Sequence, residues 1–271
     1  MSAAAADTAA LAADHALAVA AVRHAGDIAL GYFRNDVRQW RKHGDSLVTE
    51  ADIAVNDHLH RALAVARPDY GWLSEETEDD RSRLLRPRVW VVDPIDGTRA
   101  FAAGTPHFCI SVALVEAGRP RCAVLFNPAS GEFFEATAGS GARCNGRPIR
   151  VSARETLAGC RMAAYAPMFK HPAWRQPWPE MEVLQRDSVA YRLALVACGE
   201  ADAALGLNNK NDWDLAAADL IVQEAGGIVS AHDGAPLVYN RVVPRHRSFL
   251  AAGPRLYDAL FTRVSQVKLR A

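Results

Sequence analysis

The chain has 271 residues, of which 50% are hydrophobic and 23% charged, a balance that is typical of a folded globular protein and excludes a disordered one. Basic and acidic residues number 31 each, so the net charge gives no overall attraction for nucleic acid or an anionic membrane. The length suits two closely packed lobes that act as one functional unit, and we place a soft boundary near residue 150, giving lobes over 1–150 and 151–271.

The alanine-rich beginning resembles an export signal in composition only. It carries Asp7, Asp14 and Asp27 and continues with helical periodicity, which favours a frayed end followed by an amphipathic helix. No uninterrupted apolar stretch is long enough to span a bilayer. The five cysteines are widely spaced with no CxxC pair, which favours a reducing cytoplasm and buried thiols.

In chain order, the polar stretch over 34–52 predicts an exposed loop or hairpin around Gly44, and a helix is expected from near Thr49 to Pro68. Strands are predicted at 89–93, 108–116, 121–127 and 132–137, and their short connections favour an antiparallel sheet in the first lobe. The second lobe alternates strands and helices, which indicates a layered α/β arrangement. Its expected elements are strands over CRMAAYA and MEVLQ around a Trp/Pro-rich loop at 170–180, a helix over SVAYRLALVACGE, a strand over DAALGL, a helix over DWDLAAADLIVQEA, strands over GIVSA and SFLAAG, and a last helix from Arg255.

The segment WVVDPIDGTRAF, residues 90–101, places Asp93 and Asp96 three residues apart, just past a predicted strand end. Pro94 and Gly97 suit a tight turn that brings both carboxylates to one side. These are also ordinary turn residues, so a surface turn is the alternative. Two carboxylates held together require a cation or a shared proton between them.

Three further acidic segments lie at predicted element ends: SEE with Glu75 and Glu76, DWD with Asp212 and Asp214, and LVTEAD with Asp52. Each has a structural alternative, since these acids are also suited to helix caps or solvated loops. Together they indicate a metal and phosphate site. Oxygen ligands without a histidine or cysteine cluster select Mg²⁺ or Mn²⁺ over Zn²⁺, and a pair of such ions about 3.5–4 Å apart suits phosphate monoester hydrolysis.

WVVDPIDGTRAF, DWDLAAADLIVQEAGG, SEE and LVTEAD, in this spacing, resemble the inositol monophosphatase family of lithium-sensitive, Mg²⁺-dependent phosphatases. The resemblance implies a layered αβαβα sandwich of the inositol monophosphatase and fructose-1,6-bisphosphatase type, an α/β (α+β) fold. It also implies two or three Mg²⁺ ions, with Mn²⁺ as a substitute, and a homodimer. The hairpin region 108–137, with Phe126, Phe133 and Phe134, is a candidate apolar dimer face, although core packing explains these rings equally well.

The family's roles are carried over here by position. Glu76, Asp93 and the carbonyl of Ile95 are expected at the first ion, and Asp93, Asp96 and Asp214 at the second. Thr98, oriented by Asp52, is expected to position the attacking water, with Glu76 holding a weak third ion through water. The expected substrate-binding residues are Asp96, Gly97, Thr98, Ser188, Lys210 and Asp214.

The substrate stays open. Where animal members have a glutamate for the inositol hydroxyls, this chain has Gly206 or Leu207, and Asp187-Ser188-Val189 replaces the usual Gly-Thr-Ala. The segment around Lys210 is similar to bacterial 3'(2'),5'-bisphosphate nucleotidases, and histidinol-phosphate phosphatases share the same core. Some relatives are non-catalytic partners of the transcription machinery, so a binding role is an alternative to turnover of a small phosphorylated metabolite.

Overall fold

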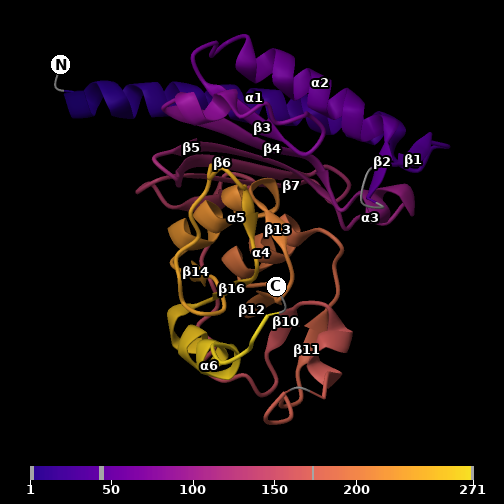
Figure 1. Ribbon diagram of the computed structural model, residues 1–271, viewed down its shortest axis with the longest axis vertical. Helices are drawn as coiled ribbons and strands as arrows, with labels where there is room; N and C mark the ends of the chain where they lie inside the picture. The colour runs from indigo at the N-terminus through magenta and orange to yellow at the C-terminus, as the bar shows by residue number, and fades with distance from the viewer. Residues whose placement is uncertain (1–2, 43–45, 173, 270–271) are drawn as a thin grey trace.

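The computed structural model describes residues 3–42, 46–172 and 174–269, and its helices and sheets form five layers (Figure 1). Helices α1 (Ala3–Tyr32) and α2 (Glu50–Ala64) cover one face of a seven-stranded sheet. Helices α4 (Val189–Ala197) and α5 (Asp212–Glu224) lie between this sheet and a five-stranded sheet, and α6 (Pro254–Val264) packs on the far side. The predicted αβαβα sandwich is therefore confirmed.

The seven-stranded sheet has the order β3-β4-β5-β6-β7-β8-β9. The pair β3–β4 is parallel and all the other pairs are antiparallel, so the predicted antiparallel sheet is confirmed. The strands are β3 (Gly71–Ser74), β4 (Arg88–Asp96), β5 (Cys109–Glu116), β6 (Arg119–Asn127), β7 (Glu132–Thr137), β8 (Ala142–Cys144) and β9 (Arg147–Pro148).

Strand β4 extends further than the sequence predicts. It continues past Pro94 to Asp96, with a break in its register against β5 between Asp93 and Asp96. Pro94 lacks an N–H for the ladder, so it is tolerated at this irregularity. The two acids therefore lie within the end of a strand rather than beyond it.

The five-stranded sheet has the order β11-β10-β12-β16-β14. Two short ladders, β1–β2 and β13–β15, complete the strands, and β1–β2 confirms the expected hairpin, although Gly44 lies outside the described residues. The remaining bounds are β1 (Gln39–Arg41), β2 (Leu47–Thr49), β10 (Arg161–Ala163), β11 (Glu182–Leu184), β12 (Ala203–Gly206), β13 (Lys210–Asn211), β14 (Ile228–Ser230), β15 (Arg245–His246) and β16 (Phe249–Ala252), with short helices η1 (Ser82–Leu85), α3 (Thr98–Ala102) and η2 (Ala166–Lys170).

The buried core is continuous across the proposed lobe boundary. One cluster contains Val89 of β4, Leu215 of α5 and Phe249 of β16, so the second half packs directly on the first sheet. Strand β4 lies between two helical layers, and this explains why Val89 to Val92 are all buried. The division into two lobes near residue 150 stays a prediction, and the two predicted lobes share this core.

The aromatic residues considered for a dimer face belong to the core. Phe133 and Phe134 are buried, and Phe126 packs against the cluster that contains Phe133. These rings therefore do not form an exposed apolar face. Among the described residues, no helix combines the length and apolar character that a membrane crossing requires.

Candidate metal and phosphate site

The turn from β4 into α3 is shaped by Gly97. Its φ of +99° lies in the region that side chains disfavour, and a Cβ there would approach the His107 carbonyl oxygen to 2.8 Å. Glycine therefore allows the chain to turn against the backbone before β5. The turn places the Asp93 and Asp96 side chains beside the start of α5.

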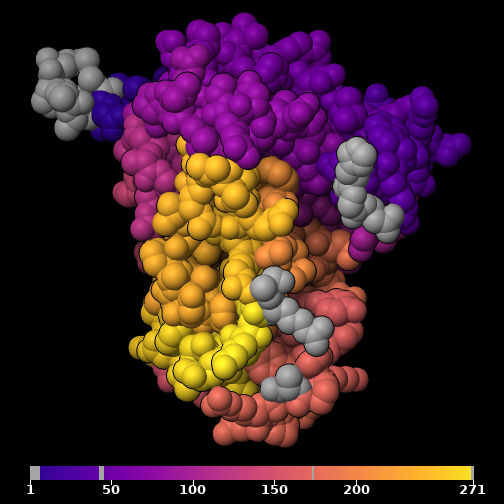
Figure 2. All heavy atoms as spheres, viewed as in Figure 1, coloured from indigo at the N-terminus to yellow at the C-terminus, as the bar shows by residue number. Residues whose placement is uncertain are grey.

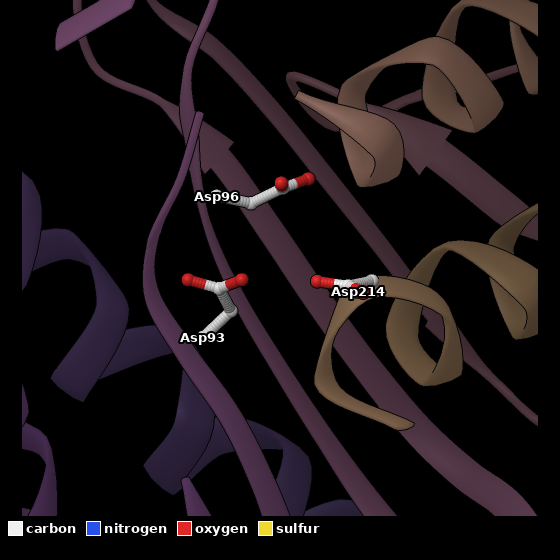
Figure 3. Close-up of side chains that lie close together, drawn as sticks. All are labelled: Asp93, Asp96 and Asp214. Atoms are coloured by element: carbon white, nitrogen blue, oxygen red, sulfur yellow. The ribbon is translucent and has the colours of Figure 1, made fainter. Parts of the chain in front are cut away.

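Three carboxylates converge at this turn. Asp93, Asp96 and Asp214 each offer an oxygen atom, and these atoms all lie within 4.8 Å of one another. Figure 3 shows Asp93 and Asp96 on β4 and Asp214 on the first turn of α5. The Asn211 amide donates to Asp214 Oδ2 at 2.7 Å, so Asp214 caps its helix as well as facing the other two acids.

The electrostatics of this cluster favour a cation. Burial raises the pKa of Asp93 well above its usual range, and the charges of Glu75, Asp96 and Asp214 add to this effect. Burial, with the charge of Asp96, raises the pKa of Asp214 to about 8. Asp93 Oδ2 is buried and has no hydrogen-bond donor among the described residues. A bound divalent ion would supply the missing partner, so the residues fit a metal site.

The structure differs from the sequence expectation at the SEE motif. Glu75 lines the cleft and its charge acts on all three aspartates, whereas Glu76 is absent from the described lining. Glu76 instead accepts from Lys42 Nζ at 2.5 Å, and Lys42 also contacts Glu75 Oε1 at 3.2 Å. The reason lies in the pairing with β4, because the Glu75 amide donates to the Val92 carbonyl and holds Glu75 beside Asp93. We therefore assign to Glu75 the metal-facing position expected for Glu76.

Thr98 and Asp52 form the pair that the sequence predicts. Thr98 Oγ1 donates to Asp52 Oδ1 at 3.0 Å and lies 3.1 Å from the Ile95 carbonyl oxygen. Asp52 also completes a capping box with Thr49, so it both caps α2, as the structural alternative proposed, and contacts Thr98 at the candidate site. Burial raises the pKa of Asp52 to about 7. A carboxylate with this pKa is suited to accept a proton near neutral pH.

Ser188 occupies a different place from the one expected. It is buried behind Asp96, donates to Asp96 Oδ2 at 2.7 Å, accepts from the Tyr191 amide, and is absent from the described cleft lining. The Ala190 amide donates to the same Asp96 oxygen at 2.6 Å. Ser188 therefore positions Asp96 at the start of α4, and its expected contact with substrate stays a prediction.

A large cleft of about 1250 Å³ opens from the acidic cluster. Its metal end contains Glu75, Asp96, Gly97, Thr98 and Asp214, and Lys210 of β13 lines the same cleft, as expected. Other residues also line the cleft. The sequence suggests Arg192 and the loop over 170–180 as candidates for binding a second phosphate or a base, with solvated surface charge and loop packing as the alternatives, whereas Tyr165, Met168, Arg247, Lys268 and Leu269 were missed because their positions depend on distant loops. The described lining beyond the metal end includes Arg99, Tyr165, Met168, His171, Trp174, Asp187, Arg192, Arg247, Lys268 and Leu269.

Comparison with known proteins places the chain in a family. Residues 11–269 match the family model described as "Inositol monophosphatase family". The chain is 36% identical to "Nus factor SuhB" of Xylella fastidiosa, covering 80% of this chain and 81% of that protein. It is 34% identical to "Histidinol-phosphatase" of Chlorobaculum parvum (79% and 84% covered) and 38% identical to "Inositol-1-monophosphatase" of Rhizobium meliloti (66% and 70% covered). The solved IMPase of Thermotoga maritima shares 28% identity with a TM-score of 0.79, covering 92% of this chain and 95% of that one.

The layered fold and the acidic cleft thus define a phosphatase of the class that acts on phosphate monoesters. The chain belongs to the inositol monophosphatase family, which is a family of metal-dependent phosphatases. The resemblance inferred from the sequence motifs is confirmed.

Proposed function

We propose that this protein hydrolyses a phosphate monoester of a small metabolite with the help of Mg²⁺. The observation that carries the proposal is the convergence of Asp93, Asp96 and Asp214 within 4.8 Å at the end of a cleft. Thr98, held by Asp52, lies at the same end. A cation-binding cluster beside a polarised hydroxyl is the arrangement that metal-assisted phosphate hydrolysis requires.

The residues proposed to hold the ions are Glu75, Asp93 and the Ile95 carbonyl for one, and Asp93, Asp96 and Asp214 for the other. When bound, Mg²⁺ would neutralise phosphate charge and lower the pKa of a coordinated water. Mn²⁺ offers a similar preference for oxygen ligands and is the expected substitute.

The protein's own residues would handle the proton and the phosphate. The Thr98 hydroxyl donates to Asp52, so its lone pairs are free to accept from the attacking water, and Asp52 is suited to receive the proton. The water oxygen forms the new bond to phosphorus, the ester P–O bond breaks, and the leaving alcohol oxygen takes up a proton from a second water in the open cleft. The Gly97 and Thr98 amides are the proposed phosphate donors.

Two features argue against inositol 1-phosphate as the preferred substrate. A Cβ at Gly206 would lie 2.4 Å from the Phe249 ring, so this position does not accept a glutamate without a shift of that ring. Leu207, the neighbouring cleft residue, has no acceptor for ring hydroxyls. Lys210 instead favours a substrate with a second anionic group, such as a nucleoside bisphosphate.

Histidinol phosphate is an alternative substrate, supported by the similarity to the Chlorobaculum histidinol-phosphatase. A binding role is a second candidate function, supported by the similarity to relatives named Nus factor. The convergence of Asp93, Asp96 and Asp214, together with the contact between Thr98 and Asp52, supports catalytic turnover over binding alone.

The test is phosphate release from a panel of inositol 1-phosphate, histidinol phosphate, adenosine 3',5'-bisphosphate and p-nitrophenyl phosphate, with Mg²⁺ or with EDTA. We expect Mg²⁺-dependent release and the highest kcat/KM for a substrate with a second anion. Absence of release from every compound, together with capture of a transcription factor in a pulldown, would support the binding role instead.

A further inference from the structure

The C-terminal segment of the chain lies on the wall of the cleft. After α6 ends at Val264, Val267, Lys268 and Leu269 line the cleft together with Arg247, which precedes β16. We call these four residues the C-terminal wall. In Figure 1 the yellow chain returns from α6 toward β12 and β16, and Figure 2 shows yellow residues beside the salmon-coloured β10–β11 region on the same face.

Two hydrogen bonds hold this segment in place. The His232 ring, through Nε2, lies 3.1 Å from the Val267 carbonyl oxygen, and Arg247 Nη2 donates to the Leu269 carbonyl oxygen at 2.9 Å. His232 is itself fixed by Ser248, whose Oγ lies 2.7 Å from Nδ1. In both hydrogen bonds the acceptor is a backbone carbonyl oxygen. They therefore fix the path of the chain without using the Lys268 side chain, which lines the cleft.

The charges of the cleft are divided unevenly. Among the described lining residues, the acids Glu75, Asp96 and Asp214 gather at the proposed metal end, where bound cations would neutralise them. Of the described acids that line the rest of the cleft, only Asp187 remains. Among the described residues, five arginine and lysine side chains line the same cleft, namely Arg99, Arg192, Lys210, Arg247 and Lys268. With cations bound at the metal end, the cleft would therefore carry more positive charge than one phosphate group neutralises.

We propose that the C-terminal wall is a specificity-determining part of the cleft, in which Lys268 and Arg247 bind a negatively charged group on the leaving-group side of the substrate. The inference rests on the proposed phosphatase function and adds the site that selects the leaving group. A phosphate or a carboxylate would satisfy these cations, because both accept charge-assisted hydrogen bonds from ammonium and guanidinium groups.

The test compares substrates that differ by one anionic group. Adenosine 3',5'-bisphosphate against adenosine 5'-monophosphate probes a second phosphate, and 3-phosphoglycerate against glycerol 3-phosphate probes a carboxylate. The variant is Lys268→Gln, which removes one positive charge and keeps both backbone hydrogen bonds. The matched control is Gln266→Glu, which makes the same change in net charge at an exposed residue of the same segment that is absent from the cleft lining.

We expect Lys268→Gln to lower kcat/KM for the member with the extra anion by about 2- to 5-fold, the effect of one exposed charge pair. The decrease should come from KM, and kcat/KM for the partner substrate that lacks the extra anion, and for p-nitrophenyl phosphate, should change less than twofold. Deleting residues 267–271 should lower kcat/KM for the same substrate by about tenfold. The deletion removes Lys268, and it also removes the Leu269 carbonyl oxygen that holds the Arg247 side chain in position. Gln266→Glu should match the wild type.

Equal effects of Lys268→Gln on both members of each pair, or equal effects of Gln266→Glu and Lys268→Gln, would overturn the inference while leaving the phosphatase function in place. If none of the compounds, p-nitrophenyl phosphate included, is hydrolysed, the proposed function fails. The wall is then judged by calorimetric binding of adenosine 3',5'-bisphosphate, where unchanged affinity in Lys268→Gln overturns it separately.

Discussion

Asp93→Asn should make the metal-free protein more stable and at the same time inactive. Asp93 Oδ1 accepts from the Ile95 amide at 3.1 Å, and an asparagine oxygen can keep this bond. The asparagine NH₂ would then occupy the position of the unpartnered Oδ2 and donate to a neighbouring carboxylate. The substitution thus removes one buried negative charge with little change in shape.

The size of the effect follows from the geometry. Two carboxylate charges 4.8 Å apart repel by about 3.5 kcal/mol at an effective dielectric constant of about 20. The cluster avoids part of this repulsion by holding protons, as the raised pKa values of Asp93, Asp96 and Asp214 indicate. We therefore expect a gain in the free energy of unfolding of about 2 kcal/mol at pH 8 in EDTA.

The pH dependence has a definite sign. The pKa of Asp214 is raised from 3.8 to about 8, so the folded protein holds this proton when the unfolded chain has lost it. The contribution of this protonated group to the stability of the metal-free protein is therefore fully present below about pH 4 and is lost as the pH rises toward 8. The full linkage would be about 5 kcal/mol at pH 8, and we reduce it to about 2 kcal/mol because the Asp214 side chain is partly accessible to solvent.

The assay is urea unfolding of wild type and Asp93→Asn at pH 5 and pH 8, in EDTA and in Mg²⁺, with phosphate release measured in parallel. The variant should gain stability at pH 8 but little at pH 5, should lose the stabilisation by Mg²⁺, and should lose at least about 10²-fold in turnover. Asp219→Asn is the control: this buried acid of α5 accepts from Tyr239 and Gln223, so its loss should destabilise the protein and leave the Mg²⁺ effect unchanged. A metal-free Asp93→Asn protein that is less stable than wild type at pH 8, or near-normal turnover, would refute this reasoning.

Three further outcomes are expected. Mg²⁺ binding at pH 7 should release protons, because the pKa of Asp214 is about 8 before binding, and calorimetry in buffers of different ionisation enthalpy that detects no release would contradict this. Lys210→Ala should lower kcat/KM for adenosine 3',5'-bisphosphate by about tenfold and for adenosine 5'-monophosphate by less, whereas an equal loss for both would remove Lys210 from substrate selection. Li⁺ should inhibit Mg²⁺-dependent phosphate release by occupying the site around Asp214, as the family resemblance implies, and release that is insensitive to Li⁺ would argue against this site.

Local sequence determined the elements and the turn that carries the chemistry. The β-branched and aromatic run before Asp93, the proline and glycine of the turn, and the Asn211–Asp214 capping signal act over a few residues, so their spacing alone predicts where acids gather. The pairing of Thr98 with Asp52 followed from the family resemblance, and the structure places the two side chains 3.0 Å apart.

The tertiary structure alone decided which side chains face the cleft. Glu75 and Glu76 are chemically identical neighbours, and the choice between them depends on how the preceding strand β3 and the Glu75 amide pair with β4, contacts that are distant in sequence. Ser188 lies behind Asp96 because α4 begins against the β4 turn, and Lys268 lines the cleft because His232 and Arg247 bind the carbonyl oxygens of Val267 and Leu269 on either side of it. Such positions depend on long-range packing, whereas periodicity and turn chemistry report only on neighbours along the chain.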